Sequence, residues 1–179
     1  MQPNLTKSRN TLIADTFDRI AVERDEWIEK NRYFYEQDWK YMRFLIPEGS
    51  SVLEIGCGTG RLLSELRPTR GVGIDLSSRM IEIAKSNYPQ LEFHHADVEL
   101  MESLGGLDGT FDYIVISDTI GLFSDCLKVL NNLQLKMDDK SRLIVAYYGK
   151  IWDPILKVSE IMGLKMKDPD QNWLAPDDI

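Results

Sequence analysis

Three glycines at alternate positions follow a carboxylate in the stretch Glu54-x-Gly56-x-Gly58-x-Gly60. The residues just before it are mostly apolar and β-branched, as in a buried parallel strand, and residues 61–66 have the pattern of a helix. Glycine adopts backbone angles that other residues avoid and lets a ligand approach the main chain closely. The stretch therefore predicts a strand, a tight loop whose amides face a ligand, and a helix. The carboxylate favours a ligand that carries positive charge.

Carboxylates also follow the later predicted strands. Asp75 lies 21 positions beyond Glu54, close to the offset of about 20 residues at which an acidic residue binds ribose hydroxyls in sheets of this class. Asp118 follows the predicted strand 111–116, and ligands bind at the carboxyl ends of strands where the strand order reverses. We expect Asp118 to lie beside the reacting group; the alternative is that it caps the helix predicted at 121–133.

Two common phosphate-binding patterns do not fit the glycine-rich loop. The dinucleotide fingerprint Gly-x-Gly-x-x-Gly, counted from Gly56, requires its third glycine where Arg61 stands. The chain also has no Gly-Lys-Ser or Gly-Lys-Thr sequence, so the loop offers no lysine to a diphosphate. An NAD-dependent dehydrogenase remains an alternative because Asp75 suits the ribose of NAD as well.

The glycine-rich stretch that begins at Glu54 resembles the first motif of the class I S-adenosylmethionine-dependent methyltransferases. The sequence at residues 17–21, Phe-Asp-Arg-Ile-Ala, resembles a segment found ahead of this motif in many of these enzymes. Asp97 followed by Val98 resembles the position where a carboxylate accepts from the adenine amino group and the next amide donates to the ring. The resemblance extends over residues 11–165. The C-terminal part looks like methyltransferase domains that are sometimes joined to glycosyltransferases.

The resemblance implies S-adenosylmethionine as the cofactor and a small-molecule acceptor that attacks the methyl carbon in line. The protein would mainly hold the reacting atoms about 3 to 3.5 Å apart, with Asp118 as the candidate catalytic residue. A cofactor-binding module without catalysis is the alternative function. The expected cofactor-binding residues lie in the loop, at the strand ends and on the N-terminal helices: Glu54, Gly56, Cys57, Gly58, Thr59, Gly60, Asp75, Leu76, Met80, Asp97, Val98, Ser117 and Tyr33.

No metal site is predicted from the histidines and cysteines. His94 and His95 are neighbours on a predicted strand, so their side chains point to opposite faces of the sheet. The only cysteines, Cys57 and Cys126, do not have the spacing of metal ligands or of a disulfide framework. We expect Cys57 to be a small buried residue that fills the loop rather than a reactive thiol.

The composition excludes several classes of protein. With 179 residues and 43% apolar content, the chain is large enough for one well-buried domain. The 29 acidic against 21 basic residues give a net charge of -8, which disfavours nucleic-acid binding. No apolar run is long enough to span a membrane, and the unpaired cysteines suit a reducing compartment, so we expect a cytoplasmic protein.

Alternation of strands and helices predicts a Rossmann-like α/β fold, a doubly wound parallel sheet with helices on both faces. Strands are predicted at 52–55, 71–75, 91–98, 111–116 and 143–147, and helices at 11–30, 35–45, 61–66, 77–87, 121–133 and 152–162. We expect residues 1–10 to be a flexible N-terminus, 11–166 the methyltransferase domain and 167–179 a linker or tail.

The predicted sheet lacks the C-terminal hairpin strands that the resemblance implies. The fifth strand, at 143–147, would then be an exposed edge whose unpaired backbone groups invite another chain. We expect either self-association through this edge or a longer protein in which a missing C-terminal segment covers it.

Overall fold

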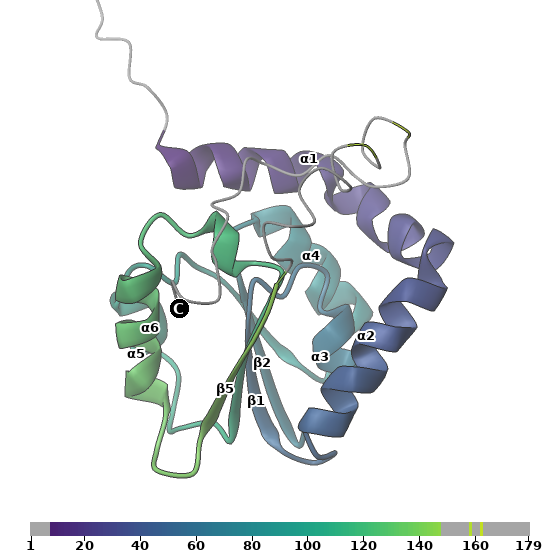
Figure 1. Cartoon of the computed structure of the whole chain (residues 1–179). Coiled ribbons are helices and arrows are strands. Elements are labelled where there is room, and N and C mark those ends of the chain that lie inside the picture. The colour runs from purple at the N-terminus through teal and green to yellow at the C-terminus, as the bar shows by residue number, and fades with distance from the viewer. Residues whose placement is uncertain (1–7, 148–157, 159–161, 163–179) are drawn as a thin grey trace, which may run out of the picture.

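Five parallel strands form a single sheet in the order β3-β2-β1-β4-β5 (Figure 1). The computed structural model describes residues 8–147 together with Val158 and Met162. The strands are β1 (Ser51–Ile55), β2 (Arg70–Asp75), β3 (Glu92–His95), β4 (Tyr113–Ser117) and β5 (Arg142–Ala146). The order reverses between β1 and β4, which places a ligand site at their carboxyl ends. The predicted doubly wound α/β fold is confirmed.

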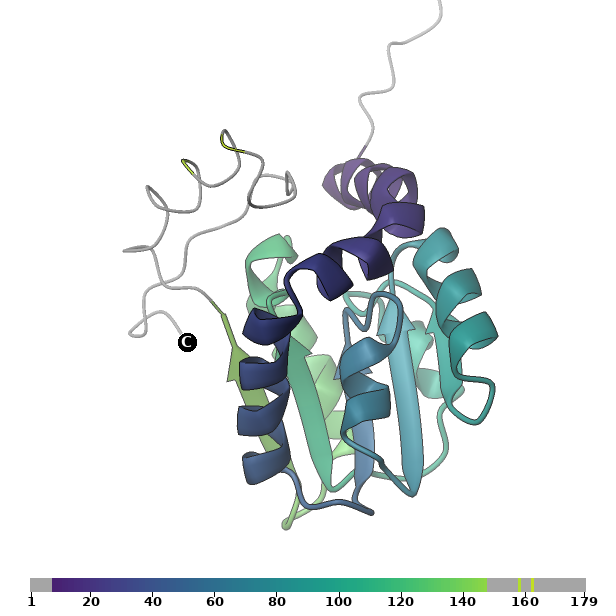
Figure 2. The same ribbon diagram turned by 90° about the vertical axis from the view of Figure 1, so that its right-hand side faces the viewer.

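Helices cover both faces of the sheet and also its carboxyl edge. Helices α2 (Arg32–Leu45), α3 (Arg61–Glu65) and α4 (Ser78–Asn87) lie on one face (Figure 2). Helices α5 (Glu102–Gly105) and α6 (Cys126–Leu133) lie on the other, with short 3-10 turns η1 (Ile120–Leu122) and η2 (Gln134–Lys136). Helix α1 (Arg9–Lys30) lies across the carboxyl ends of the strands (Figure 1).

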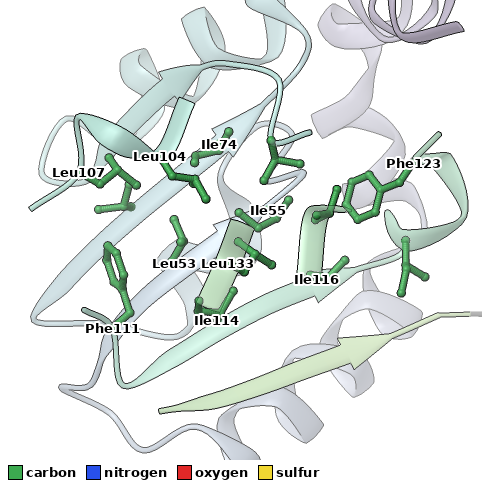
Figure 3. Close-up of a cluster of buried hydrophobic side chains, with 14 residues drawn as sticks. Leu53, Ile55, Ile74, Leu104, Leu107, Phe111, Ile114, Ile116, Phe123 and Leu133 are labelled. Atoms are coloured by element: carbon green, nitrogen blue, oxygen red, sulfur yellow. The ribbon is translucent and has the colours of Figure 1, made fainter. Parts of the chain in front are cut away.

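Alternation along the strands divides the core into two layers. Leu53 and Ile55 of β1 join Leu104 of α5 and Leu133 of α6 in one apolar cluster (Figure 3). Val52 points to the opposite face, where it packs with residues of α2, α3 and α4. Glu54 alternates with Leu53 and Ile55, so its side chain projects towards α3 rather than α6.

Several predicted boundaries differ from the observed ones because of local capping. Helix α1 begins at Arg9, inside the segment predicted as flexible, because the Ser8 hydroxyl accepts a hydrogen bond from the Thr11 amide. The third strand ends at His95 rather than residue 98. There the Asp97 carboxylate accepts from the Glu99 amide, a side-chain turn that ends extended structure.

The helix predicted at 121–133 begins later than expected, at Cys126. The Asp125 carboxylate caps it by accepting from the Lys128 amide, and residues 120–122 form the turn η1 instead. Asp118 therefore does not cap this helix, and that alternative is wrong. The predicted helix 152–162 and tail 167–179 lie outside the described residues, apart from two isolated positions in the helix.

Strand β5 lies at one end of the sheet, as predicted. Among the residues that the structure describes, it pairs with β4 alone. Its side chains from Leu143 to Ala146 are half-buried, in contrast to the fully buried central residues of β4. Within the described residues β5 is therefore the outermost strand on this side of the sheet.

We expect Gly73→Ala to destabilise the fold. A Cβ at this position would lie 2.7 Å from the Phe93 ring and 2.8 Å from the Cys57 sulfur, so both would have to shift. Overpacking of this kind should lower the free energy of unfolding by about 1 to 3 kcal/mol, measured by urea denaturation. Gly105→Ala is the control, because no atom lies within 4 Å of its added Cβ. Equal losses in both variants would contradict the packing role of Gly73.

Candidate functional site

The loops that follow β1, β2, β3 and β4 meet at the carboxyl edge of the sheet, beneath α1 (Figure 1). This edge gathers most of the predicted site residues, because the carboxyl ends of parallel strands lie together. The register places Glu54 of β1 opposite Gly73 of β2 and Val115 of β4. The loop after β1 therefore starts from the centre of the sheet.

The three loop glycines have positive φ angles, but they serve two different purposes. Their φ values are 72° at Gly56, 52° at Gly58 and 78° at Gly60. A Cβ on Gly56 would collide with the Thr119 side chain, and one on Gly60 would lie 2.6 Å from the Phe93 ring. A Cβ on Gly58 would meet no atom within 4 Å. Close packing within the protein thus requires two of the glycines, and only Gly58 borders open space.

The Asp75 carboxylate fixes the loop from the end of β2. Its Oδ2 accepts from the Gly58 amide and its Oδ1 accepts from the Ser77 amide, each at 2.8 Å. Burial raises the pKa of Asp75, while these two amides and the positive charge of Arg24 oppose the rise. The carboxylate thus has a fixed orientation before any ligand binds.

The Glu54 carboxyl group lacks comparable partners. Its side chain is 3% exposed, and its Oε2 is buried without a hydrogen-bond partner in the described structure. Burial and, to a lesser extent, the charge of Asp75 raise the pKa of Glu54 to about 8, although the Leu63 amide acts in the opposite direction. A buried carboxyl with a free oxygen is unfavourable in the protein alone and is suited to a ligand that carries a donor or a positive charge.

Asp97 joins the site from the loop after β3. Its Oδ2 accepts from the Asn10 side-chain amide at 2.8 Å, and its Oδ1 accepts from the Glu99 amide at 2.9 Å. The next residue, Val98, is 6% exposed and packs in the apolar core. Asp97 therefore offers a polar group at the surface of the site, while the Val98 side chain faces inward.

Other predicted residues of the β2 and β4 ends are also close to this edge. Ser77 caps α4 by accepting from the Met80 amide, and the Met80 side chain is 2% exposed, so it serves as core packing. Leu76 is half-buried, and its carbonyl lies 3.1 Å from a ring nitrogen of His95. The Ser117 carbonyl at the end of β4 accepts from the Thr119 hydroxyl.

Asp118 is exposed and has a left-handed backbone conformation with φ of 52°. Its amide donates to the Ala146 carbonyl at 2.8 Å, which ties the end of β4 to the end of β5. A residue other than glycine in this conformation is uncommon, and such residues cluster at functional sites. Its place beside the reversal of strand order keeps it a candidate for contact with the acceptor.

The expectation for Tyr33 is not supported by the structure, whereas the one for the two histidines agrees with it. The structure does not bring Tyr33 into this group, because its side chain is 79% exposed at the start of α2. His94 pairs with Glu92, whereas His95 lies against the Leu76 carbonyl, so the two rings are separated as predicted. Within the described residues, no group of three or more His, Cys, Asp or Glu side chains could hold a metal ion.

Cys57 is buried between the loop and β2. Its sulfur would lie 2.8 Å from a Cβ on Gly73, so it fills the space that this glycine leaves. Burial, with added repulsion from Asp75 and Glu54, raises the pKa of the Cys57 thiol well above its ordinary value. A thiol that stays protonated is a weak nucleophile, which agrees with a packing role.

Sequence reasoning missed three polar residues of α1 that reach the site. Asn10 donates to Asp97, Asp18 accepts from the Ser77 hydroxyl, and Asp25 accepts from the Thr59 hydroxyl at 2.6 Å. The available signal was the spacing of short polar side chains by eight and seven residues along a predicted helix, which places them near one face. The sequence did not indicate what that face would contact.

A family model described as a methyltransferase domain matches residues 46–173. A demethylmenaquinone methyltransferase of Thermotoga maritima is 31% identical, over 91% of this chain and 82% of its own length. A malonyl-[acyl-carrier protein] O-methyltransferase of Bacillus anthracis is 27% identical, and the match spans 78% of this chain but only 54% of that protein. Among solved structures, a SAM-dependent methyltransferase of Thermotoga maritima has a TM-score of 0.73 at 23% identity, over 93% of this chain and 76% of that one.

The protonation of Glu54 should make the stability depend on pH. The unfolded chain releases this proton near pH 4.5, but the folded protein keeps it until about pH 8. Folding therefore takes up a proton between these values, so the contribution to the free energy of unfolding is complete below pH 4.5 and declines up to about pH 8. Glu54→Gln should remove this decline. The free energy of unfolding of the variant, relative to that of wild type, should therefore increase by about 1 kcal/mol or more between pH 5.5 and 8.

Urea denaturation at both pH values measures this difference. Glu23→Gln is the matched control, because Glu23 is exposed on α1. A constant difference between Glu54→Gln and wild type across the range would show that Glu54 is already ionised in the folded protein.

Proposed function

Because the chain belongs to the methyltransferase domain family, we propose that it transfers a methyl group from S-adenosylmethionine to a small-molecule acceptor. The family resemblance predicted from the glycine-rich motif is confirmed. The observation that carries the proposal is the open loop at Gly58 together with the buried Glu54 carboxyl, whose Oε2 has no hydrogen-bond partner in the described structure.

The residues at the carboxyl edge fit this cofactor on three observations. The space beside Gly58 lets a ligand approach the backbone without a Cβ in the way. The free oxygen of Glu54 suits the ammonium group of the methionine part. The Asp75 carboxylate, at the end of the second strand, suits the ribose hydroxyls, and its negative charge would repel an added phosphate.

We assign the remaining contacts to the other strand ends. Asp97 is assigned to accept from the adenine amino group, as the family resemblance implies, and Thr59 in the glycine-rich loop and Ser117 at the end of β4 are assigned as further contacts. Because Asp75 is already held by the Gly58 and Ser77 amides, little reorganisation is needed when it binds a hydroxyl. The predicted contact of Tyr33 is not supported, since its side chain points to solvent.

When bound, the cofactor supplies an activated methyl group on a positively charged sulfonium. The protein's part is then to hold the acceptor in line with that carbon and to exclude water. Asp118, at the end of β4, is the group that we place beside the acceptor, where its carboxylate can orient a donor or take up the proton that the acceptor loses. The chain's net charge of -8 agrees with a small organic acceptor rather than nucleic acid.

The location of the protein and an alternative function are two further proposals. No helix among the described residues is long and apolar enough to cross a membrane. A cytoplasmic protein is the location that agrees with this finding and with two unpaired cysteines. The alternative function is a cofactor-binding module without catalysis, which would bind S-adenosylmethionine but transfer no methyl group.

We expect the chain to bind S-adenosylmethionine and not NAD, and Asp75→Ala to weaken binding by about 1.5 to 3 kcal/mol. Affinity should fall because the variant lacks a charged hydrogen bond to the ligand and also lacks the hydrogen bond that holds the Gly58 amide. Gly58→Ala should also weaken binding, because its Cβ enters the open space of the loop. Calorimetry measures both effects.

Gly109→Ala is the matched control for Gly58→Ala. Gly109 also has a positive φ, of 63°, and its added Cβ meets only the end of Arg70, outside the glycine-rich loop. Unchanged affinity in both Asp75→Ala and Gly58→Ala would overturn the site. Transfer of labelled methyl from the cofactor to a panel of small acceptors separates the enzyme from the binding module.

We also propose self-association through β5, since this strand has unpaired backbone groups on its outer side in the described sheet. Light scattering over a concentration series should show a mass that rises with concentration. Val145→Lys, on the half-buried outer strand, should keep the protein monomeric. A strict monomer at all concentrations would contradict the proposal.

A further inference from the structure

The Glu54 carboxyl group is enclosed near the carboxyl end of β1, the central strand of the sheet. Its register partners on the two neighbouring strands are Gly73 and Val115, neither of which has a polar side chain. Glu54 is 3% exposed, and within the described part of the chain its Oε2 has no hydrogen-bond partner. An ionised carboxylate in such a place is unfavourable unless a ligand supplies the missing donor.

The groups around Glu54 favour its neutral form. Its titratable neighbours are the Asp75 carboxyl at the end of β2 and the Cys57 thiol in the glycine-rich loop, and neither can carry positive charge. The charged residue at the end of β4 is another acid, Asp118, which is exposed. Burial and the charge of Asp75 raise the pKa of Glu54 to about 8 against the opposing effect of the Leu63 amide on α3. The carboxyl is therefore largely protonated at pH 7 in the free protein.

The cations of the surrounding elements are engaged with other groups. The Arg61 guanidinium at the start of α3 lies over the Trp39 ring of α2, 5.3 Å from its centroid. The charges of Arg24 on α1 and His95 on β3 act on Asp75. None of these cations contributes to the pKa of the buried acid on β1, which leaves that acid open to a cation from a ligand.

Asp75 differs from Glu54 because its oxygens already have donors. The Gly58 amide donates to one of its oxygens and the Ser77 amide to the other, each at 2.8 Å. Hydrogen bonds of this kind favour the ionised form of a carboxyl group. Of the two buried acids, Glu54 is therefore the one with a proton to lose and with an oxygen that lacks a partner.

We propose that Glu54 is a proton-coupled binding site for the ammonium group of the cofactor, so that the carboxyl loses its proton to solvent when S-adenosylmethionine or S-adenosylhomocysteine binds. This inference rests on the proposed function. The ammonium supplies both the donor and the positive charge that the buried oxygen lacks, so it stabilises the ionised form. No bond of the ligand changes in this step. Because binding releases a proton, affinity falls as the pH falls.

The coupling acts on binding and not on methyl transfer. The cofactor and its demethylated product carry the same ammonium group, so Glu54 stays ionised while the methyl group moves. The proton returns only when the product leaves. The ligand-binding step alone is therefore sufficient to test the proposal.

Calorimetry in buffers of different ionisation enthalpy counts the protons released on binding. At pH 7, wild type should release about one proton for each S-adenosylhomocysteine bound, and its affinity should rise about five- to tenfold from pH 6 to pH 7. The ligand's α-amino group keeps its charge over this range, because the ordinary pKa of such a group is about 7.7 to 8.0. Binding without proton release and with constant affinity would overturn the coupling.

The ligand 5′-methylthioadenosine separates Glu54 from the other titratable groups of the site. It has the adenine, ribose and sulfur of the cofactor but no ammonium group. It should therefore bind with almost no proton release, and its affinity should change by less than about twofold from pH 6 to pH 7. Proton release equal to that with S-adenosylhomocysteine would assign the proton to Asp75 or His95 and would overturn the role of Glu54.

Glu54→Gln keeps the shape of the side chain but cannot titrate. It should bind S-adenosylhomocysteine without proton release and with an affinity that is constant from pH 6 to pH 7. Glu23→Gln is the matched control, because it makes the same change at an exposed position of α1. This control should retain the proton release and the pH dependence of wild type. Proton release from Glu54→Gln at the wild-type level would show that another group supplies the proton.

The two levels of inference fail in different ways. If wild type binds neither S-adenosylhomocysteine nor 5′-methylthioadenosine, the proposed cofactor site is wrong. If wild type binds S-adenosylhomocysteine without releasing a proton, the cofactor site stands and the coupling through Glu54 is wrong.

Discussion

The rest of the site depends on the two hydrogen bonds that the Asp75 carboxylate accepts. One oxygen holds the Gly58 amide and the other holds the Ser77 amide, so a single side chain joins the loop after β1 to the start of α4. Ser77 in turn donates to Asp18 of α1. A continuous path of hydrogen bonds therefore runs from the glycine-rich loop to the helix above it, and a ligand bound at Asp75 would be linked to both.

This arrangement places two acids, Glu54 and Asp75, in a buried setting where ionisation of both is unfavourable, so Glu54 keeps its proton up to about pH 8. Burial raises the pKa of each, and the charge of Asp75 adds to the effect at Glu54. The apolar clusters on the two faces of the sheet supply the stability that offsets this unfavourable pair. A positively charged ligand would favour the ionised form of Glu54, so binding of such a ligand would be coupled to release of a proton.

The glycines show how one motif combines stability with binding. Gly56 and Gly60 allow the loop to pack against Thr119 and Phe93, and they would be needed even without a ligand. Of the three loop glycines, only Gly58 borders open space. The missing side chain at this position therefore affects ligand binding rather than packing. Substitutions in the loop therefore separate into those that damage the fold and those that damage binding.

The sequence by itself determined the parallel α/β fold, the glycine-rich loop and the acid at position 75, because strand and helix periodicity and loop chemistry are local properties of the chain. It also gave α1 and α2 to within a few residues. Only the tertiary structure decided that Asp125 rather than Asp118 caps α6, that Tyr33 points to solvent, and which glycine faces open space. It likewise decided the bonds of α1, since Asn10 and Asp97 are 87 residues apart and their contact depends on how the whole sheet brings its loops together. Such long-range contacts leave no periodic trace in a single sequence.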